Sequence, residues 1–391
     1  MSVMHDDWRL ASAGLSDTHE SFRATAREFI KREIVPFDEQ WRAAGIIDKD
    51  VFARAGAAGL LGTDVPEQYG GGGVEDFRFN AIFREEAARA GVGPSAARIA
   101  LHNDVCIPYF LDCTTEAQRT RWLPGICAGS TVTAIAMTEP SAGSDLAAIT
   151  TSAVREGDAY VLNGAKTMIS NSVNCDLVIV ACKTDPTKRH DGMSLLVVDP
   201  SSAGFSRGKR FSKVGQASSD LGELFFDDVV VPADHLLGGE GEGFRLLVTK
   251  LPRERLSIAL DAVYQAEAAL ALTLDYTSQR TAFGKPIASF QHSRFVLAEM
   301  RTELDIARVF VDRQIDALNA GELSAEAAAE AKWWCSELCK RVVDQCVQLH
   351  GGYGYMDEFE ISRIWRDTRV LTLYGGTTEI MKEIIGRGMG A

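Results

Sequence analysis

The segment Ala136-Met-Thr-Glu-Pro-Ser-Ala-Gly-Ser-Asp145 stands where the sequence changes from a helical to a β-rich pattern. It contains several turn residues, and its clustered backbone N–H groups and hydroxyls can wrap a flat polar ring. A Pro/Gly/Ser turn stabilised by Asp and Thr side chains is the alternative, and the segment alone favours neither reading. The sequence on its two sides decides the architecture.

Before this segment the pattern is helical. Phe22, Phe29, Ile30 and Ile34 recur at amphipathic spacing up to Pro36, and clusters such as YGGGG (residues 69–73) separate further helical segments. After it, short runs rich in β-branched and apolar residues appear at 176–182, 193–198 and 224–231. This change predicts a small β domain inserted between helical ones.

Beyond Gly243 the helical period returns and persists. A stripe with alternating spacings of three and four indicates packing in a helix bundle: Leu297, Met300, Leu304, Ala307, Val311, Ile315 and Leu318. We therefore predict a mainly α protein with an inserted β domain. The expected domains are an N-terminal helical domain at 1–129, a central β domain at 130–240 and a C-terminal helical bundle at 241–391.

Length and charge limit the class of protein. A chain of 391 residues exceeds the usual size of one core, and 46% hydrophobic with 24% charged residues is typical of a globular protein. The net charge of -13 disfavours nonspecific binding to nucleic acid or anionic membranes. The N-terminal MSVMHDDWRL is acidic where a secretion signal is basic and apolar. A cytoplasmic protein is expected, with neither nucleic acid nor a membrane as partner.

The eight cysteines form no CxxC pair. Cys335, Cys339 and Cys346 lie at helical spacing, which favours buried thiols over metal ligands, so no metal site is expected. The GGEGEG run at 238–243 lacks the GK[ST] ending of a phosphate loop and is interpreted as a linker entering a helix.

Three further motifs follow the β zone: Arg280-Thr-Ala-Phe-Gly-Lys-Pro286 with Gln291, Gln348-Leu-His-Gly-Gly352, and Leu373-Tyr-Gly-Gly-Thr-Thr-Glu379. In this order and spacing, together with residues 136–145, they resemble the acyl-CoA dehydrogenases over nearly the whole chain. The resemblance implies a helical N-terminal domain, a central β-barrel-like domain and a C-terminal four-helix bundle. It also implies a homotetramer or dimer of dimers, with FAD between the β domain, the bundle and a neighbouring subunit.

The resemblance also implies roles for individual residues. Flavin is expected against Ile135, Met137, Thr138, Gly143, Ser144, Met168 and Ser170, with Arg280, Phe283 and Gln291 reaching the FAD of an adjacent subunit. The adenosine-diphosphate part is expected near Gln348, Gly351, Gly352, Thr377 and Glu379. Acyl-CoA is expected near Ser144, Arg255, Gly376 and Arg387, although both arginines can equally be structural ion-pair residues. Met168 departs from the tryptophan that many members carry, which affects how the flavin is tuned.

A second departure concerns the catalytic base. Many members carry a glutamate where this chain has Gly375, and glycine has no proton acceptor. Either the protein is inactive or another carboxylate acts. In Leu251-Pro-Arg-Glu-Arg-Leu256, Glu254 matches the base of the long-chain and isovaleryl-type members. Without that resemblance, Glu254 reads as an exposed helix carboxylate paired with a nearby arginine.

The resemblance implies α,β-dehydrogenation of an acyl-CoA to the trans-2-enoyl-CoA, with electrons passed to an electron-transferring flavoprotein. Thioester oxygen would accept hydrogen bonds from a flavin hydroxyl and from the backbone N–H of Gly375, a donor that glycine retains. The alternatives are a non-catalytic FAD-binding subunit of a hetero-oligomer and an oxygen-using flavin oxidase or monooxygenase. Acyl chain length and branching do not follow from the sequence.

Overall fold

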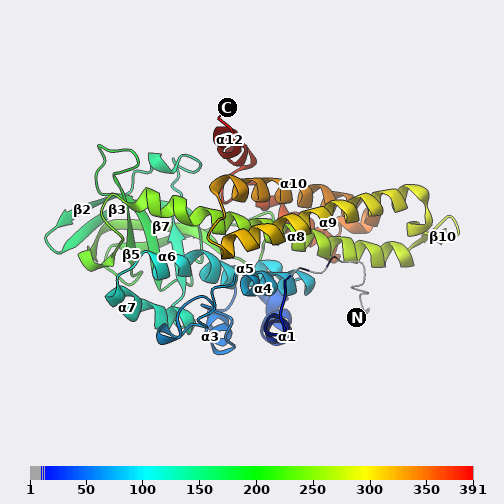
Figure 1. Ribbon diagram of the computed structural model, residues 1–391, viewed down its shortest axis with the longest axis horizontal. Helices are drawn as coiled ribbons and strands as arrows, with labels where there is room; N and C mark the ends of the chain where they lie inside the picture. Colours follow the sequence, from blue (N-terminus) through cyan, green and yellow to red (C-terminus); the bar gives the residue numbers. More distant parts are fainter. Residues whose placement is uncertain (1–9, 11, 13, 391) are drawn as a thin grey trace.

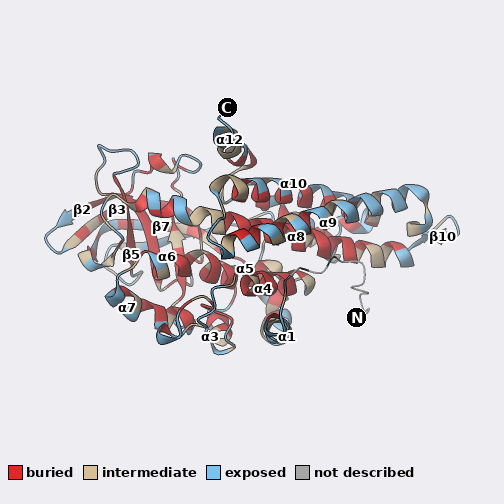
Figure 2. Cartoon of the chain, viewed as in Figure 1, coloured by how far each residue is buried: buried red, intermediate tan, exposed pale blue. Residues whose placement is uncertain are grey.

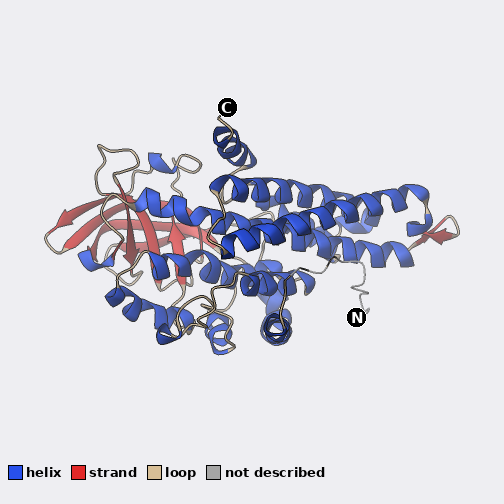
Figure 3. Ribbon diagram, viewed as in Figure 1, coloured by secondary structure: helices blue, strands red, loops and turns tan. Residues whose placement is uncertain are grey.

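A computed structural model describes residues 10, 12 and 14–390, so most of the N-terminal MSVMHDDWRL segment lies outside the described residues. Figure 1 shows an elongated molecule with the sheet at one end and the long helices at the other. No helix in these described ranges has both the length and the apolar character needed to span a bilayer. Figure 3 shows that helices and strands occupy separate regions.

The first part of the chain, up to Cys127, folds into helices joined by short turns. The first apolar stripe folds as predicted into an amphipathic helix, which continues through a π-helical turn to Ile34 and ends at the Val35–Phe37 turn containing Pro36. The N-terminal helices are α1 (Asp17–Phe29), α2 (Asp38–Ala44), α3 (Asp50–Ala57), α4 (Arg78–Arg89), α5 (Gly93–Ala100), α6 (Ile107–Asp112) and α7 (Glu116–Cys127).

The β zone folds into one eight-stranded sheet of order β6-β7-β3-β2-β4-β5-β8, with β1 paired in parallel to β4. No hydrogen-bonded pairing joins the end strands β6 and β8 within the described sheet, so the barrel-like expectation becomes an open curved sheet. Its strands are β1 (Thr133–Ala136), β2 (Ser152–Glu156), β3 (Ala159–Ser170), β4 (Leu177–Lys183), β5 (Met193–Val198), β6 (Phe205–Arg210), β7 (Leu221–Pro232) and β8 (Leu236–Leu237).

The central strands β4 and β5 are buried along their whole length. Ile179 and Ala181 face a core shared with α6 and α7, whereas Val178 and Val180 face a second core built by β3 and β7. Because alternate side chains point to opposite faces, a strand covered on both sides reads as the continuous apolar run seen in the sequence. Figure 2 shows the buried strands at the centre of this end.

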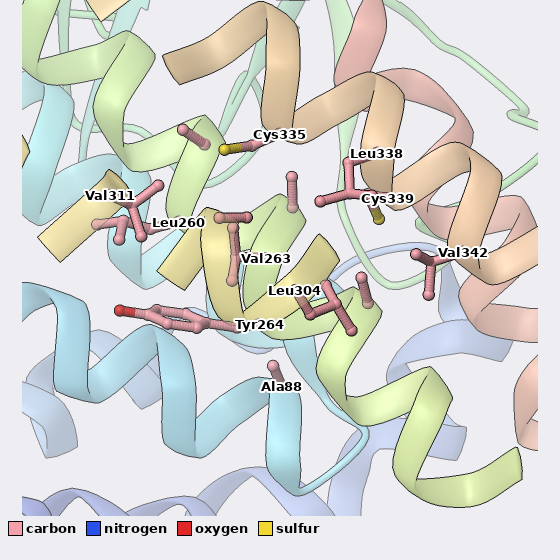
Figure 4. Close-up of a cluster of buried hydrophobic side chains, with 14 of the residues drawn as sticks. Ala88, Leu260, Val263, Tyr264, Leu304, Val311, Cys335, Leu338, Cys339 and Val342 are labelled. Atoms are coloured by element: carbon pink, nitrogen blue, oxygen red, sulfur yellow. The ribbon is translucent and has the colours of Figure 1, made fainter. Parts of the chain in front are cut away.

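Long helices build the C-terminal region, and a short hairpin projects from its far end (Figure 1). The predicted stripe lies on α9, where Met300, Leu304 and Val311 are buried in the bundle core (Figure 4). The elements are α8 (Gly243–Gln279), β9 (Thr281–Ala282), β10 (Lys285–Pro286), α9 (Gln291–Asn319), α10 (Ala325–His350), α11 (Glu360–Thr368) and α12 (Thr378–Gly388).

All eight cysteines are free and buried. Cys335 and Cys339 project from α10 into the bundle core, as their spacing predicted (Figure 4). Burial raises the pKa of both Cys346 and Cys339 to about 12, so these thiols stay protonated at neutral pH.

A buried arginine joins the bundle to the N-terminal helices. The Arg308 side chain is 1% exposed, and its guanidinium lies 2.7 Å from Glu85 of α4 and 2.7 Å from Glu267 of α8. The two carboxylates hold the pKa of Arg308 above its usual range, against the effect of burial. Removing this cation would leave two buried carboxylates facing each other.

We expect Arg308→Met to lower the free energy of unfolding by about 3–5 kcal/mol, because it removes the buried cation that the Glu85 and Glu267 carboxylates share. Arg341→Met is the matched control, since Arg341 pairs with Glu303 at 3.5 Å and lies over the Trp334 ring on the protein surface. That change is expected to lower stability by less than about 1 kcal/mol. Urea denaturation of the two variants measures the difference, and equal losses would contradict the assigned role of Arg308.

Candidate active site

Glu254 lies on α8 with its carboxyl group inside the protein. The residue is only 7% exposed, and Tyr109 of α6 donates a hydrogen bond of 2.9 Å to Glu254 Oε1. No hydrogen bond to Oε2 occurs among the described residues, so one carboxyl oxygen is free. The expectation of a solvated, ion-paired carboxylate, which the sequence favours without the family resemblance, is therefore wrong.

Burial raises the pKa of Glu254 to about 7, while the Tyr109 hydrogen bond and the charge of Arg255 act in the opposite direction. A carboxyl group in an apolar enclosure holds its proton more tightly, which makes its anion a stronger base. At neutral pH, Glu254 is therefore divided between acid and anion. This is the range in which a general base works best.

Gly375 and Gly376, here called the glycine pair, lie against the part of α8 that carries Glu254. Arg255 donates a hydrogen bond of 3.4 Å to the Gly375 carbonyl, and a Cβ on Gly375 would meet Ile258 Cδ1 at 2.3 Å. Gly375 has a φ of 67°, a conformation that favours glycine. No acceptor in the described chain lies in hydrogen-bond geometry to the Gly375 N–H. The structure thus brings together the base and a free backbone donor from segments about 120 residues apart.

Lys332, which the sequence analysis did not select, stabilises the same turn. Its Nζ donates a 2.6 Å hydrogen bond to the Gly376 carbonyl, and the residue is fully buried on α10. Burial lowers the pKa of Lys332 to about 8, and the nearby charge of Arg255 lowers it further. A lone lysine within the apolar stripe of Ala328, Ala331 and Cys335 was the available signal, because such positions normally carry core residues.

Glu139 holds the turn formed by residues 137–144 in place through hydrogen bonds of its buried carboxylate. Its carboxylate accepts hydrogen bonds from the backbone N–H groups of Thr150 and Thr151 at 2.7 and 2.9 Å. Lys166 of β3 lies 2.8 Å from the same carboxylate and 3.0 Å from the Met137 carbonyl. Both side chains are buried, so this ion pair fixes the turn while leaving Ser144 exposed.

Met168 and Ser170 are brought beside that turn by β3. The Thr167 N–H donates to the Thr138 carbonyl at 3.0 Å, where the β3–β7 register shifts. Met168 has a φ of 56° and is 63% exposed, so a bulge presents this apolar side chain outward. The half-buried Ile135, Met137 and Thr138 lie on the same end of the sheet, so the structure gathers the expected flavin-facing residues.

A second group lies at the far end of the bundle. Arg280 is placed over the Tyr353 ring at 5.8 Å, which joins the hairpin to the turn containing Gly351 and Gly352. Phe283 is 96% exposed, and Gln291 and Gln348 are exposed close by in the chain. Figure 1 shows this hairpin at the opposite end of the molecule from the sheet.

The remaining expected residues lie on or near α12. Thr377 caps this helix by accepting a hydrogen bond from the Ile380 N–H at 3.3 Å, and Glu379 is exposed in its first turn. Arg387 is exposed near the end of α12 and pairs with Glu383 at 2.6 Å. The structure therefore places Arg387 in an ion pair within its own helix, and its expected contact with acyl-CoA stays a prediction.

The residues present fit a flat dinucleotide such as FAD. A Cβ at Gly143, Gly351 or Gly352 would meet nothing within 4 Å, so backbone is open to close approach there. Met168 and Phe283 offer uncovered apolar surface, and exposed Arg280 offers charge for a pyrophosphate. The group at the sheet would hold a flavin ring, and the group at the far end of the bundle would hold a pyrophosphate; the two groups lie at opposite ends of the molecule.

Comparison with known proteins agrees with this geometry. Three family models match consecutive parts of the chain: Acyl-CoA dehydrogenase, N-terminal domain at residues 16–130, the middle domain at 134–229 and the C-terminal domain at 241–390. Fold and site thus define a FAD-dependent oxidoreductase that acts on acyl-CoA. The chain belongs to the acyl-CoA dehydrogenase family, which includes flavoproteins of fatty-acid β-oxidation.

Individual relatives match along nearly the whole chain. The long-chain specific acyl-CoA dehydrogenase of Rattus norvegicus mitochondria is 41% identical over 374 residues, which cover 95% of this chain and 86% of the relative. A crystal structure of an acyl-CoA dehydrogenase from Geobacillus kaustophilus is 47% identical with a TM-score of 0.95, covering 97% and 100% of the two chains. A structure described as an electron transferring flavoprotein of Acidaminococcus fermentans is 33% identical with a TM-score of 0.91, covering 97% and 99%.

We expect Tyr109→Phe to move the acidic limb of the activity profile to higher pH by about one to two units, because a hydrogen bond to an anion contributes about 1.5–3 kcal/mol. With Glu254 acting as the base, the rate is expected to rise with pH through about 7 in the parent protein. The pH dependence of flavin reduction by an acyl-CoA measures the shift.

Tyr69→Phe is the matched control, because Tyr69 donates to Glu116 at 2.6 Å away from this site. That variant is expected to keep the parent profile. An unchanged limb in Tyr109→Phe would show that the hydrogen bond does not tune the base.

Proposed function

We propose that this protein catalyses the α,β-dehydrogenation of an acyl-CoA thioester to the trans-2-enoyl-CoA, with Glu254 as catalytic base. The observation that carries the proposal is the buried Glu254 carboxyl beside the Gly375 turn, where the usual carboxylate of the family is missing. Residues 254 and 375 are the two positions at which family members carry the catalytic glutamate, and both lie at this part of the structure. The glutamate at 254 therefore compensates for the glycine at 375.

Glu254 removes the α-proton with its free oxygen Oε2, while Tyr109 holds Oε1. The Tyr109 bond fixes the plane of the carboxyl group, so the free oxygen keeps one direction. Tyr109 itself does not compete as a base, because burial and the neighbouring Glu254 raise the pKa of its hydroxyl well above 10. The proton stays on Glu254 until the product leaves.

The Gly375 N–H stabilises the negative charge that develops on the thioester oxygen when the proton leaves. A preorganised donor contributes several kcal/mol when it points at developing charge. Arg255 and Lys332 act as positioning residues, since each binds a carbonyl of the glycine pair and so restricts the turn. When bound, FAD supplies the acceptor for the hydride from the β-carbon.

Electrons are proposed to pass to an electron-transferring flavoprotein, as the family resemblance implies, and fatty-acid β-oxidation is the proposed context. The similarity to the Acidaminococcus fermentans structure supports this acceptor. A dehydrogenase of this kind reacts slowly with oxygen in its reduced state. Rapid reoxidation by air would identify an oxidase or monooxygenase, and the cytoplasmic location stays a prediction.

The two halves of the expected FAD site support a shared arrangement between subunits. Glu254 and Arg280 are separated by about 39 Å along α8, at 1.5 Å per residue. One FAD beside Glu254 therefore cannot reach the Arg280 hairpin of the same chain. We propose that Arg280, Phe283 and Gln291 contact the FAD of a neighbouring subunit in a homotetramer or dimer of dimers.

We expect Glu254→Gln to lower the rate of flavin reduction by ~10²–10⁴-fold, because the amide keeps the size but loses the basicity. FAD content is expected to stay near that of the parent, and absorbance measures both quantities. Glu303→Gln on α9 makes the same chemical change at a half-buried position outside this site and is expected to keep the parent rate. Parental rates in Glu254→Gln on its best acyl-CoA would overturn the assignment.

Adding Gly375→Glu to Glu254→Gln is expected to restore part of the lost rate. The new side chain would meet Ile258 Cδ1, and the positive φ strains any side chain by about 1–3 kcal/mol. Ile258→Ala in the same background is expected to increase the recovery, because it removes that contact.

We expect Arg280→Gln to weaken FAD retention by about tenfold, because one charge-assisted hydrogen bond to phosphate contributes about 1.5–3 kcal/mol. Dialysis followed by measurement of bound flavin and of oligomeric state tests this. Arg301→Gln is the control, since Arg301 pairs with Asp305 on an exposed face of α9. Unchanged FAD retention in a stable monomer would contradict the shared site.

A further inference from the structure

Two buried contacts join the same pair of segments near the base. One is the hydrogen bond of 2.9 Å that Tyr109 donates to Glu254 Oε1. The other runs through Arg84 of α4, whose Nε donates to Asp104 Oδ2 at 2.6 Å and whose Nη1 donates to Asp261 Oδ2 at 2.5 Å. Asp104 lies shortly before α6, and Asp261 lies on α8. Arg84 thus connects the segment that carries Tyr109 to the helix that carries Glu254.

The order of these contacts gives the relative direction of the two segments. The chain advances five residues from Asp104 to Tyr109, whereas their partners on α8 follow in the opposite order, from Asp261 back to Glu254. The segments are therefore antiparallel, with two cross-links between them. The α8 partners are seven residues apart, which is two turns or about 10 Å, so both lie on one face of the helix. Two cross-links restrict both the distance and the rotation between the segments.

The segment that leads to Tyr109 begins with a π-helical turn, Leu101–Cys106. The Ile107 N–H bonds to the His102 carbonyl five residues back, so this turn contains one residue more than an α-helical turn. Such turns are rare and less regular than α-helix, and tertiary contacts are needed to hold them. The direction in which α6 leaves the turn, and with it the position of the Tyr109 hydroxyl, therefore depends on what binds the turn.

Three consecutive side chains of this turn bind three different parts of the protein. His102 Nδ1 lies 2.7 Å from Thr133 Oγ1 of β1, and Asn103 Oδ1 accepts a 2.6 Å hydrogen bond from the Gly62 N–H. These two contacts fix the turn to the sheet and to the N-terminal helices. Asp104, through Arg84, provides the link to α8.

The geometry of this link is fixed because it is enclosed. The Arg84 side chain is 7% exposed and that of Asp104 is 2% exposed. A guanidinium is a planar fork, so it binds two carboxylates in set directions. The two carboxylates hold the pKa of Arg84 above its usual range, against the effect of burial, and the cation persists at any working pH.

The groups that alter the pKa of Glu254, besides its burial, are Tyr109 from the facing segment and Arg255 from α8 itself. Cys106, at the end of the π-helical turn, is a neutral neighbour, because burial raises the pKa of its thiol to about 12. Arg84 lies outside this set. An effect of Arg84 on Glu254 is therefore expected to pass through Tyr109.

We propose that Arg84 is a positioning residue for the catalytic base, because its bridge keeps the Tyr109 hydroxyl within hydrogen-bond reach of Glu254. This inference rests on the proposed function, since it concerns how the base is held. A hydrogen bond weakens steeply once its length and angle depart from the optimum, so a small shift of α6 away from α8 leaves Oε1 without its donor. Glu254 then binds its proton more tightly and acts only at higher pH.

The test is a double-mutant cycle on the pH profile of the FAD-loaded protein. Arg84→Met is expected to move the acidic limb of flavin reduction by an acyl-CoA to higher pH by about one unit, as for other residues coupled through one contact. In the Tyr109→Phe background the same change is expected to move the limb by less than about 0.3 unit, because the hydrogen bond is already absent. Equal shifts in both backgrounds would show a direct effect of the Arg84 charge and would overturn the inference.

Arg308→Met is the matched control, because Arg308 is likewise a buried arginine between a carboxylate of α4 and one of α8. It is expected to lose stability and to keep the parent limb. A shift of the same size in Arg308→Met would indicate general loosening of the helices and contradict the role of Arg84. Should Arg84→Met fail to fold, Asp261→Ala decides, since it removes the α8 end of the bridge at a side chain that is 24% exposed. Its limb is expected to move in the same direction.

Infrared titration of the Glu254 carboxyl, assigned by its loss in Glu254→Gln, measures the same pKa without turnover. If this titration moves in Arg84→Met while no acyl-CoA reduces the flavin, the proposed function is wrong and the positioning by Arg84 stands. If acyl-CoA reduces the flavin through Glu254 and neither readout moves in Arg84→Met or Asp261→Ala, only the role of Arg84 is wrong.

Discussion

Enclosing one ionisable carboxyl group is the constraint on which the site depends. Glu254 receives a single hydrogen bond from Tyr109, and burial moves its pKa from an ordinary value of 4.5 to about 7. That difference corresponds to about 3 kcal/mol. Because the folded pKa is raised, the protein loses this amount of stability as pH rises from about 4.5 through 7. The apolar core around α8, which includes Leu256 and Ile258, must offset this loss.

Much of the fold could be predicted from the sequence because its patterns are local. The buried strands Leu177–Lys183 and Met193–Val198 read as unbroken apolar runs, and the stripe on α9 keeps one period for six turns. Glu254 was found because a short motif surrounds it. Tyr109 had no such signal, since a tyrosine in an apolar helix is common and its partner lies 145 residues away. Lys332 did carry a signal, a single lysine in an apolar stripe, but its contact with the Gly376 carbonyl lies 44 residues away in the sequence.

The surroundings of Gly375 are suited to a residue without a side chain. Gly375 adopts a backbone conformation that side chains rarely occupy, and Ile258 fills the volume that a side chain would need. Arg255 and Lys332 bind the two carbonyl groups and limit a turn that two glycines would leave loose. At the sheet, the register shift in β3 leaves the Met168 side chain 63% exposed.

The enclosed cysteines have a practical consequence. No native thiol competes at the surface, since all eight are buried. Maleimide or iodoacetamide reagents would therefore leave the folded chain unlabelled, because they need an accessible thiolate. One cysteine introduced at an exposed position, such as Val214 in the β6–β7 connection, becomes a unique attachment point. A fluorophore or spin label placed there would report on the β domain without a cysteine-free background having to be made.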